Sequence, residues 1–153
     1  MPMWNDNLDA YTTAGAKKVA ATTAGSKGVT LANSTTYYIP IPPQLLRSRA
    51  DIEIRWASAV VGTFTIETTD LPSSDVTDYD STAGNWQQFN SPASYVPVTG
   101  SGNSASATTV TAGGSAAGAC VFALTGISAQ HMRIKAAITT GGLVRFSAEG
   151  KEG

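Results

Sequence analysis

Apolar and polar residues alternate in several short stretches of this chain, with the period of two that is typical of a half-buried β-strand. The clearest stretch is Asp51–Val61, in which Ile52, Ile54 and Trp56 share one face. After a glycine, Thr63–Thr68 alternates in the same way. We therefore expect these two runs to form an antiparallel hairpin.

The last third of the chain contains three more segments of this kind. Ala119–Leu124 is a short apolar run, Met132–Ile138 alternates cleanly, and Leu143–Glu149 follows a turn at 139–142. Weaker strand signals lie before and between these segments, and no segment has the period of a long helix. About eight to ten short strands with regular turn signals predict an all-β fold, namely a jelly-roll-like antiparallel β-sandwich.

The first 15 residues have no clear strand pattern, and we expect them to form an N-terminal arm. Residues 16–153 then make a single β-sandwich domain, which suits a chain of 153 residues. Trp4 and Tyr11 lie in the arm. Such an arm can become ordered on binding a neighbour, so these aromatic residues are candidates for docking.

The segment Thr99–Gly118 is built from small residues and carries no charge. Two interpretations remain open. The segment is either a flexible loop or a long hairpin whose small side chains pack flat against a partner.

Charge is scarce and unevenly distributed. Charged residues make up 14% of the chain, against roughly 25% in typical soluble domains. No lysine or arginine lies between Trp56 and Met132, whereas five acidic residues lie within Glu67–Asp80. Basic ends around an acidic middle suit charge complementarity between neighbouring copies or with a host surface. Several solvated faces that never meet are the alternative.

The remaining global features bear on partners and location. The net charge of −1 does not indicate nucleic-acid binding. No apolar run has the length needed to cross a bilayer, and the first residues lack the apolar core of a signal peptide. We expect synthesis in a host cytoplasm, with no direct nucleic-acid partner and no membrane partner.

Groups that support catalysis or metal binding are few. Cys120 and His131 are the single cysteine and histidine, which nearly excludes zinc, and Cys120 is expected to be a small buried core residue. The acidic residues of 67–80 lack EF-hand spacing, so a solvated loop is favoured over a calcium site. Glu53 and Glu67 are favoured as partners of basic residues across a sheet over a glycosidase pair. We expect no enzyme, no catalytic residue, no metal and no cofactor.

Three aromatic residues leave a different binding function open. Tyr79, Trp86 and Tyr95 lie in or beside polar segments, outside the alternating apolar faces. Exposed aromatic rings on a β-sandwich are suited to stacking against sugars. A carbohydrate-binding surface is therefore one of the functions that the sequence allows.

Two segments together give the chain a family resemblance. Ile54–Glu67 is followed by an Asp-rich loop and Trp86, and Gly126–Lys135 is followed by a glycine turn and a last strand that ends in 149–153. Over roughly the latter two thirds of the chain, this arrangement resembles the small β-sandwich virion structural proteins of tailed bacteriophages. The resemblance is greatest to capsid decoration (cement) proteins.

This resemblance implies a non-enzymatic protein on the capsid surface of the virion, which binds and stabilises neighbouring major capsid subunits. It also implies a homo-oligomer, with a trimer favoured. A tail or head-fibre component with a carbohydrate-binding β-sandwich is the alternative. The candidate interface residues are the aromatic residues of the arm and the middle and the aspartates of the acidic loop: Trp4, Tyr11, Asp70, Asp75, Asp78, Tyr79, Asp80 and Trp86.

Overall fold

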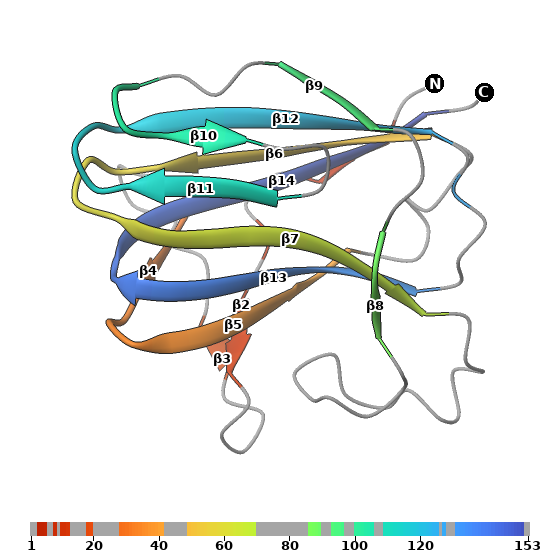
Figure 1. The fold of residues 1–153 in the computed structure, drawn as a ribbon. Coiled ribbons are helices and arrows are strands. Elements are labelled where there is room, and N and C mark those ends of the chain that lie inside the picture. Colours follow the sequence, from red (N-terminus) through yellow and green to blue (C-terminus); the bar gives the residue numbers. More distant parts are fainter. Residues whose placement is uncertain are drawn as a thin grey trace.

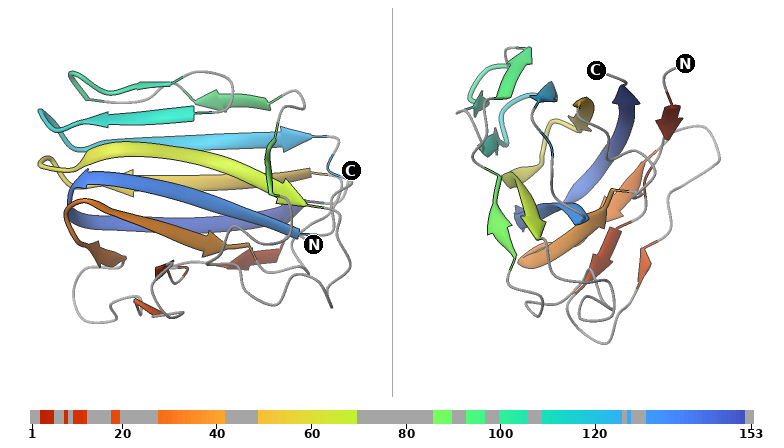
Figure 2. Two further views of the ribbon diagram at one scale, coloured as in Figure 1. Left: turned by 60° about the horizontal axis from the view of Figure 1, so that its bottom comes forward. Right: turned by 90° about the vertical axis from the view of Figure 1, so that its right-hand side faces the viewer.

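The computed structural model describes residues 3–5, 8, 10–12, 18–19, 28–41, 49–69, 86–89, 93–96, 100–105, 109–125, 127 and 131–151. All regular secondary structure in these ranges is β-strand, arranged in two antiparallel sheets that pack face to face (Figure 1). The two layers are visible from one end in the right-hand view of Figure 2. The prediction of an all-β antiparallel sandwich is therefore confirmed.

The first sheet has six strands. Its order is β1-β14-β6-β12-β9, and β4 also pairs with β14. The strands are β1 (Met3–Asn5), β4 (Val29–Leu31), β6 (Arg49–Trp56), β9 (Ala93–Val96), β12 (Gly118–Thr125) and β14 (Gly142–Lys151).

The second sheet has eight strands. Its order is β10-β11-β7-β13-β5-β2-β3, and β8 also pairs with β7. The strands are β2 (Ala10–Thr12), β3 (Lys18–Val19), β5 (Thr35–Pro40), β7 (Val61–Thr69), β8 (Gln87–Gln88), β10 (Ser104–Ala105), β11 (Thr109–Gly113) and β13 (His131–Thr140).

Four connections cross from one sheet to the other at the same end of the sandwich, on the left in Figure 1. They join β4 to β5, β6 to β7, β11 to β12 and β13 to β14. The order β4-β14-β6-β12 in one sheet matches the order β5-β13-β7-β11 in the other. Each strand of this central set is therefore joined across the core to the strand at the matching position.

The expected hairpin between 51–61 and 63–68 is wrong. Both runs are strands, but β6 pairs with β12 and β14, whereas β7 pairs with β11 and β13. The chain turns at 57–60 and enters the opposite sheet, so the inward faces of the two strands meet across the core. Alternation in two successive runs is the same for a hairpin and for a crossing between sheets.

Glycine permits two close backbone approaches at this end. Gly62 lies inside β7, where a Cβ atom would come within 2.6 Å of the Ala137 carbonyl oxygen. Its partner strand β13 has an irregularity between Ile138 and Thr140. At Gly141, a Cβ atom would overlap the Leu31 carbonyl oxygen. An isolated glycine in a strand often marks such a bulge or close approach, and that is its role at Gly62.

An aromatic cluster joins the two sheets in the core. Phe64 of β7 stacks on Trp56 of β6, with ring centroids 5.6 Å apart and planes at 29°. It also meets Phe146 of β14 edge to face, with centroids 5.9 Å apart. All three side chains are buried. Contacts of this geometry contribute about 0.5–1.5 kcal/mol each beyond the burial of apolar area.

The described residues of the expected N-terminal arm belong to both sheets. β1 pairs with β14, and β2 pairs with β5 and β3. Leu8 and Ala10 are buried in the core, and the Leu8 amide donates a hydrogen bond to the Phe146 carbonyl at 2.7 Å.

Trp56→Ala should lower the free energy of unfolding by about 3–5 kcal/mol, because it removes a buried indole from the core and leaves the Phe64 ring without the ring it stacks on. Chemical denaturation followed by circular dichroism measures this change. Thr30→Ala, at an exposed position of β4, is the control and should stay within about 0.5 kcal/mol of the unmodified protein. A near-neutral effect of Trp56→Ala would place the indole outside the core.

The Cys120 thiol should resist alkylation in the folded protein. Cys120 is buried on the inward face of β12, and this burial raises the pKa of its thiol to about 11. The reactive thiolate is therefore scarce at neutral pH. Iodoacetamide followed by mass spectrometry should show labelling in denaturant but not without it. Rapid labelling of the native protein would contradict the buried position.

Candidate interaction surfaces

A buried arginine organises the outer face of the eight-stranded sheet. Arg133 of β13 lies between two aromatic rings, with its guanidinium carbon 3.9 Å from the Tyr38 ring centre and 4.2 Å from that of Trp86. Its Nε donates to Glu67 Oε1 at 2.9 Å. The Arg133 side chain is only 2% exposed. We name these four residues the Arg133 cluster.

The sheet register explains why these residues meet. Met132 and Ile134 point into the core, so Arg133 points outward. Arg133 is directly opposite Glu67 of β7. Tyr38 of β5 is opposite the next outward residue of β13. The preference for Glu67 as a cross-strand partner of a basic residue is therefore confirmed.

The chemistry of the Arg133 cluster is suited to holding a cation out of water. A buried charge is very costly unless it is paired and hydrogen-bonded. The carboxylate of Glu67 supplies the opposite charge, and the two ring faces add cation–π attraction. In the sequence, Glu67 precedes the aspartates at 70–80 and Trp86 follows them. Arg133 therefore contacts one residue before these aspartates and one residue after them.

Two of the predicted interface residues lie on this face. Trp86 is half-buried against Arg133. Tyr11 of β2 is also half-buried and pairs in register with Tyr38. Trp4 lies in β1, at the edge of the other sheet, opposite Glu149. The structure therefore brings Tyr11 and Trp86 to one face and leaves Trp4 elsewhere.

The other predicted interface residues lie outside the described residues. These are Asp70, Asp75, Asp78, Tyr79 and Asp80. Tyr95, a candidate for sugar stacking, lies in β9 at the edge of the six-stranded sheet.

Next to the Arg133 cluster, the same outer face carries short uncharged side chains. Thr63 and Thr65 of β7 are directly opposite Thr111 and Thr109 of β11. Their neighbours Val110 and Phe64 point inward and are buried. Part of the segment 99–118 is thus a strand pair, β10 with β11, which favours the hairpin interpretation. We name Thr63, Thr65, Thr109 and Thr111 the threonine surface.

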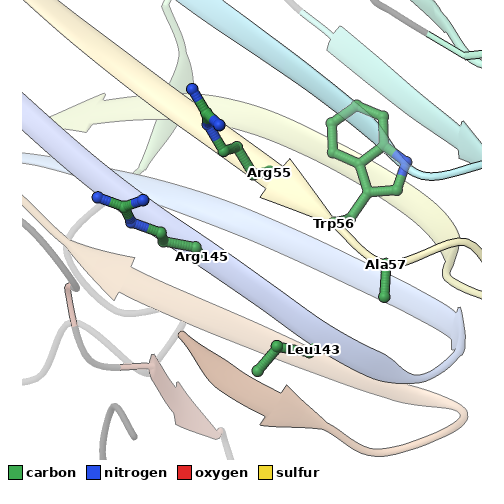
Figure 3. Close-up of a pocket in the computed structure, with 5 residues that line it drawn as sticks. All are labelled: Arg55, Trp56, Ala57, Leu143 and Arg145. Carbon is green, nitrogen blue, oxygen red and sulfur yellow. The ribbon is translucent and has the colours of Figure 1, made fainter. Parts of the chain in front are cut away.

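The outer face of the six-stranded sheet has a different character, and it holds a pocket of about 250 Å³. Arg55 of β6 and Arg145 of β14 are directly opposite in the register and extend side by side (Figure 3). Trp56, Ala57 and Leu143 complete the lining. The Ala57 amide donates a hydrogen bond to the Leu143 carbonyl at 3.0 Å. This bond joins the start of the β6–β7 connection to the start of β14, beside the pocket.

Glu53 already contacts one of these arginines. Arg55 Nε donates to Glu53 Oε1 at 3.0 Å, and Nη2 donates to Oε2 at 3.3 Å. The pairing of Glu53 with a basic residue is therefore confirmed, although the partner is two positions along the same strand.

The geometry does not assemble the catalytic alternatives. Glu53 and Glu67 lie on outer faces of different sheets, so they cannot flank one glycosidic bond as a carboxylate pair. Cys120 points into the core from β12, whereas His131 shares the outward face of β13 with Arg133. Within the described ranges, no group of three or more His, Cys, Asp or Glu side chains is placed to hold a metal ion.

Comparison with protein-family models, curated proteins and solved structures found no match. In the part of the chain that the structure describes, no helix is long and apolar enough to span a membrane.

Sequence reasoning missed the pocket and the burial of Arg133. Alternation predicts that Arg55, Arg133 and Arg145 point outward, and it is right in each case. It does not tell which outward residues become neighbours, because that depends on pairing between strands far apart in the chain. The register that places Arg55 beside Arg145 has no local signal in the sequence.

Glu67→Gln should destabilise the protein by about 2–3 kcal/mol, because it leaves the buried Arg133 cation without its carboxylate. Urea unfolding followed by tryptophan fluorescence measures this change. The matched control is Glu53→Gln, which removes the carboxylate of an exposed ion pair and should cost less than about 1 kcal/mol. If Glu67→Gln and Glu53→Gln changed the free energy of unfolding equally, burial would not make the Arg133–Glu67 ion pair more important for stability than the Arg55–Glu53 ion pair.

Proposed function

We propose that this chain is a non-enzymatic structural protein of a tailed bacteriophage virion, namely a capsid decoration protein that binds neighbouring major capsid subunits. The order of the strands is the observation that carries this proposal. It adds to the family resemblance that the sequence has over 54–67 and 126–153.

The connectivity of the eight central strands supports the interpretation of the sandwich as a jelly roll. Two four-stranded layers, β4-β14-β6-β12 and β5-β13-β7-β11, are linked strand by strand through four crossings at one end. Virus capsid proteins are among the users of the jelly roll, and so are lectins. A fold is shared by many functions, so the surface must decide between these two.

The threonine surface supports the capsid proposal. Its side chains are short and uncharged, and they cover adjacent strands β7 and β11. Contact cores between proteins are depleted in charged residues, because every buried charge must be paired. Lys135 is directly opposite Thr65 and borders this surface, so a partner that covers it needs one acidic group to pair with that cation. At its edge the half-buried Trp86 adds an aromatic side chain, a type that is enriched at such contacts.

One observation favours the alternative of a carbohydrate-binding tail or head-fibre component. Trp86 is only half-buried on the outer face. Part of its ring is occupied by Arg133 at 4.2 Å, which leaves less of it for stacking on a sugar than a fully exposed indole would offer. The capsid proposal is therefore the one that we favour.

Thr63→Arg and Thr111→Arg should each weaken binding to capsids at least about tenfold, because a long charged side chain in a flat contact leaves a buried unpaired cation. The assay is co-sedimentation of purified protein with expanded capsids that lack decoration. Thr30→Arg, on β4 of the other sheet, is the matched control and should bind like the unmodified protein. Circular dichroism confirms that each variant is folded.

Two results would contradict the proposal in different ways. If the unmodified protein binds no capsid and no other virion sub-assembly, the structural role is rejected. If it binds but Thr63→Arg and Thr111→Arg bind equally well, the capsid lies on another face.

A further inference from the structure

We propose that Lys135, which borders the threonine surface, forms an ion pair with an aspartate or glutamate carboxylate of the major capsid protein that covers this face. The inference rests on the proposed function and deepens it, because it names the chemical group that the partner must present. Its test changes Lys135 alone, so the ion pair can be rejected while capsid binding through the threonine surface stands.

Lys135 lies in the middle of the outer face. Its strand, β13, lies between β7 and β5 in the eight-stranded sheet (Figure 1). Lys135 is directly opposite Thr65 on one side and Tyr38 on the other. The next outward residue along β13 is Ala137, which is opposite Thr63. A flat partner that covers the threonine surface therefore also covers Lys135, which has no sheet edge beside it at which its ammonium group can remain in water.

The sheet gives Lys135 no carboxylate of its own. Glu67 is the only acidic residue in the described strands of the eight-stranded sheet, and it is bonded to Arg133 at 2.9 Å. The ion pair of Arg55 with Glu53 lies on the other sheet. Lys135 is only half-buried, so water solvates its charge while the face is uncovered.

A partner that removes this water has to replace it. A charge that is taken out of water is very costly unless it is paired and hydrogen-bonded. A carboxylate placed over Lys135 offsets this cost, whereas an uncharged surface does not. Lys135 therefore discriminates between two flat uncharged partner surfaces that differ only in one acidic side chain, which is how an unpaired charge confers specificity on a contact.

A second copy of this chain does not supply that carboxylate through the same face. In an isologous contact a patch meets the identical patch of its partner, so two Lys135 side chains would come to one small uncharged surface. Like charges across a contact are unfavourable, and Glu67 of each copy is already bonded to Arg133. The charge of this face thus favours a different protein as its partner.

A nucleic acid is also a poorer partner than a protein carboxylate. Its binding depends on several lysine or arginine side chains, each of which neutralises one phosphate. Arg133 is only 2% exposed and is bonded to Glu67, so Lys135 is the basic residue of β13 that a ligand can reach. One lysine among threonines is suited to a single carboxylate on a flat surface.

Co-sedimentation of variants with expanded capsids that lack decoration tests the ion pair. Lys135→Gln should bind at least about tenfold more weakly than the unmodified protein, because the partner carboxylate is then buried without a cation. Lys135→Arg keeps the charge and should bind within about threefold of the unmodified protein. Lys151→Gln makes the same charge change on β14 of the other sheet and is the matched control, with no effect expected.

Salt and cross-linking separate an ion pair from a merely structural role. Raising the salt from about 0.05 M to about 0.5 M should weaken capsid binding of the unmodified protein more than that of Lys135→Gln. Carbodiimide joins a lysine amine directly to a carboxylate that contacts it. Mass spectrometry of the cross-linked complex should therefore find Lys135 joined to an aspartate or glutamate of the major capsid protein. Lys135→Arg should bind without forming this cross-link, since it has no primary amine.

Four outcomes would overturn the proposal. If Lys135→Gln binds capsids normally while Thr63→Arg binds weakly, the ion pair is rejected and the capsid contact stands. A cross-link from Lys135 only to carboxylates of this same chain would assign the lysine to its own copy or to a second copy. Binding of a single-stranded oligonucleotide that is lost in Lys135→Gln, with capsid binding unchanged, would assign it to phosphate. If the unmodified protein binds no capsid, the proposed function and the ion pair are both rejected.

Discussion

The four crossings at one end of the sandwich are the constraint on which the rest of the structure depends. Each crossing carries the chain from one sheet to the matching position in the other, so the inward faces of consecutive strands meet across the core. The contact of Phe64 with Trp56 and Phe146 is a direct result of this arrangement. Gly62 and Gly141 permit the close approach that the crossings require. The arginine pocket lies between two neighbouring crossings and exists because they are adjacent.

The sequence predicts which face of a strand is buried, because alternation is a local property. The inward positions of 52–56, 132–138 and 144–148 are all as alternation predicts. It does not predict which strands pair, since that depends on contacts between residues far apart in the chain. The expected hairpin at Gly62 was wrong for this reason. The burial of Arg133 was missed for the same reason, because Tyr38 and Trp86 reach it from distant parts of the sequence.

The two outer faces of the sandwich differ in chemistry, and this difference separates two kinds of contact. The six-stranded sheet presents rows of arginine and carboxylate side chains, as at Arg55 with Arg145 and Asp51 with Glu149. Such a face forms specific ion pairs and resists being covered by a flat apolar partner, because its charges would lose their water. The threonine surface of the eight-stranded sheet has no charge of its own and is bordered by Lys135. The charged face and the threonine surface therefore place different demands on any surface that covers them.

The Arg133 cluster shows how the outer face of the eight-stranded sheet holds a buried charge. The cluster lies at the edge of the uncharged face, yet Glu67 and Trp86 flank the acidic segment in the sequence. By contacting both, Arg133 links β7 to the residue that precedes β8. A single buried cation thus joins β5, β7, β13 and the residue that precedes β8 on one outer face, and each of these contacts depends on the pairing of strands that are far apart in the chain.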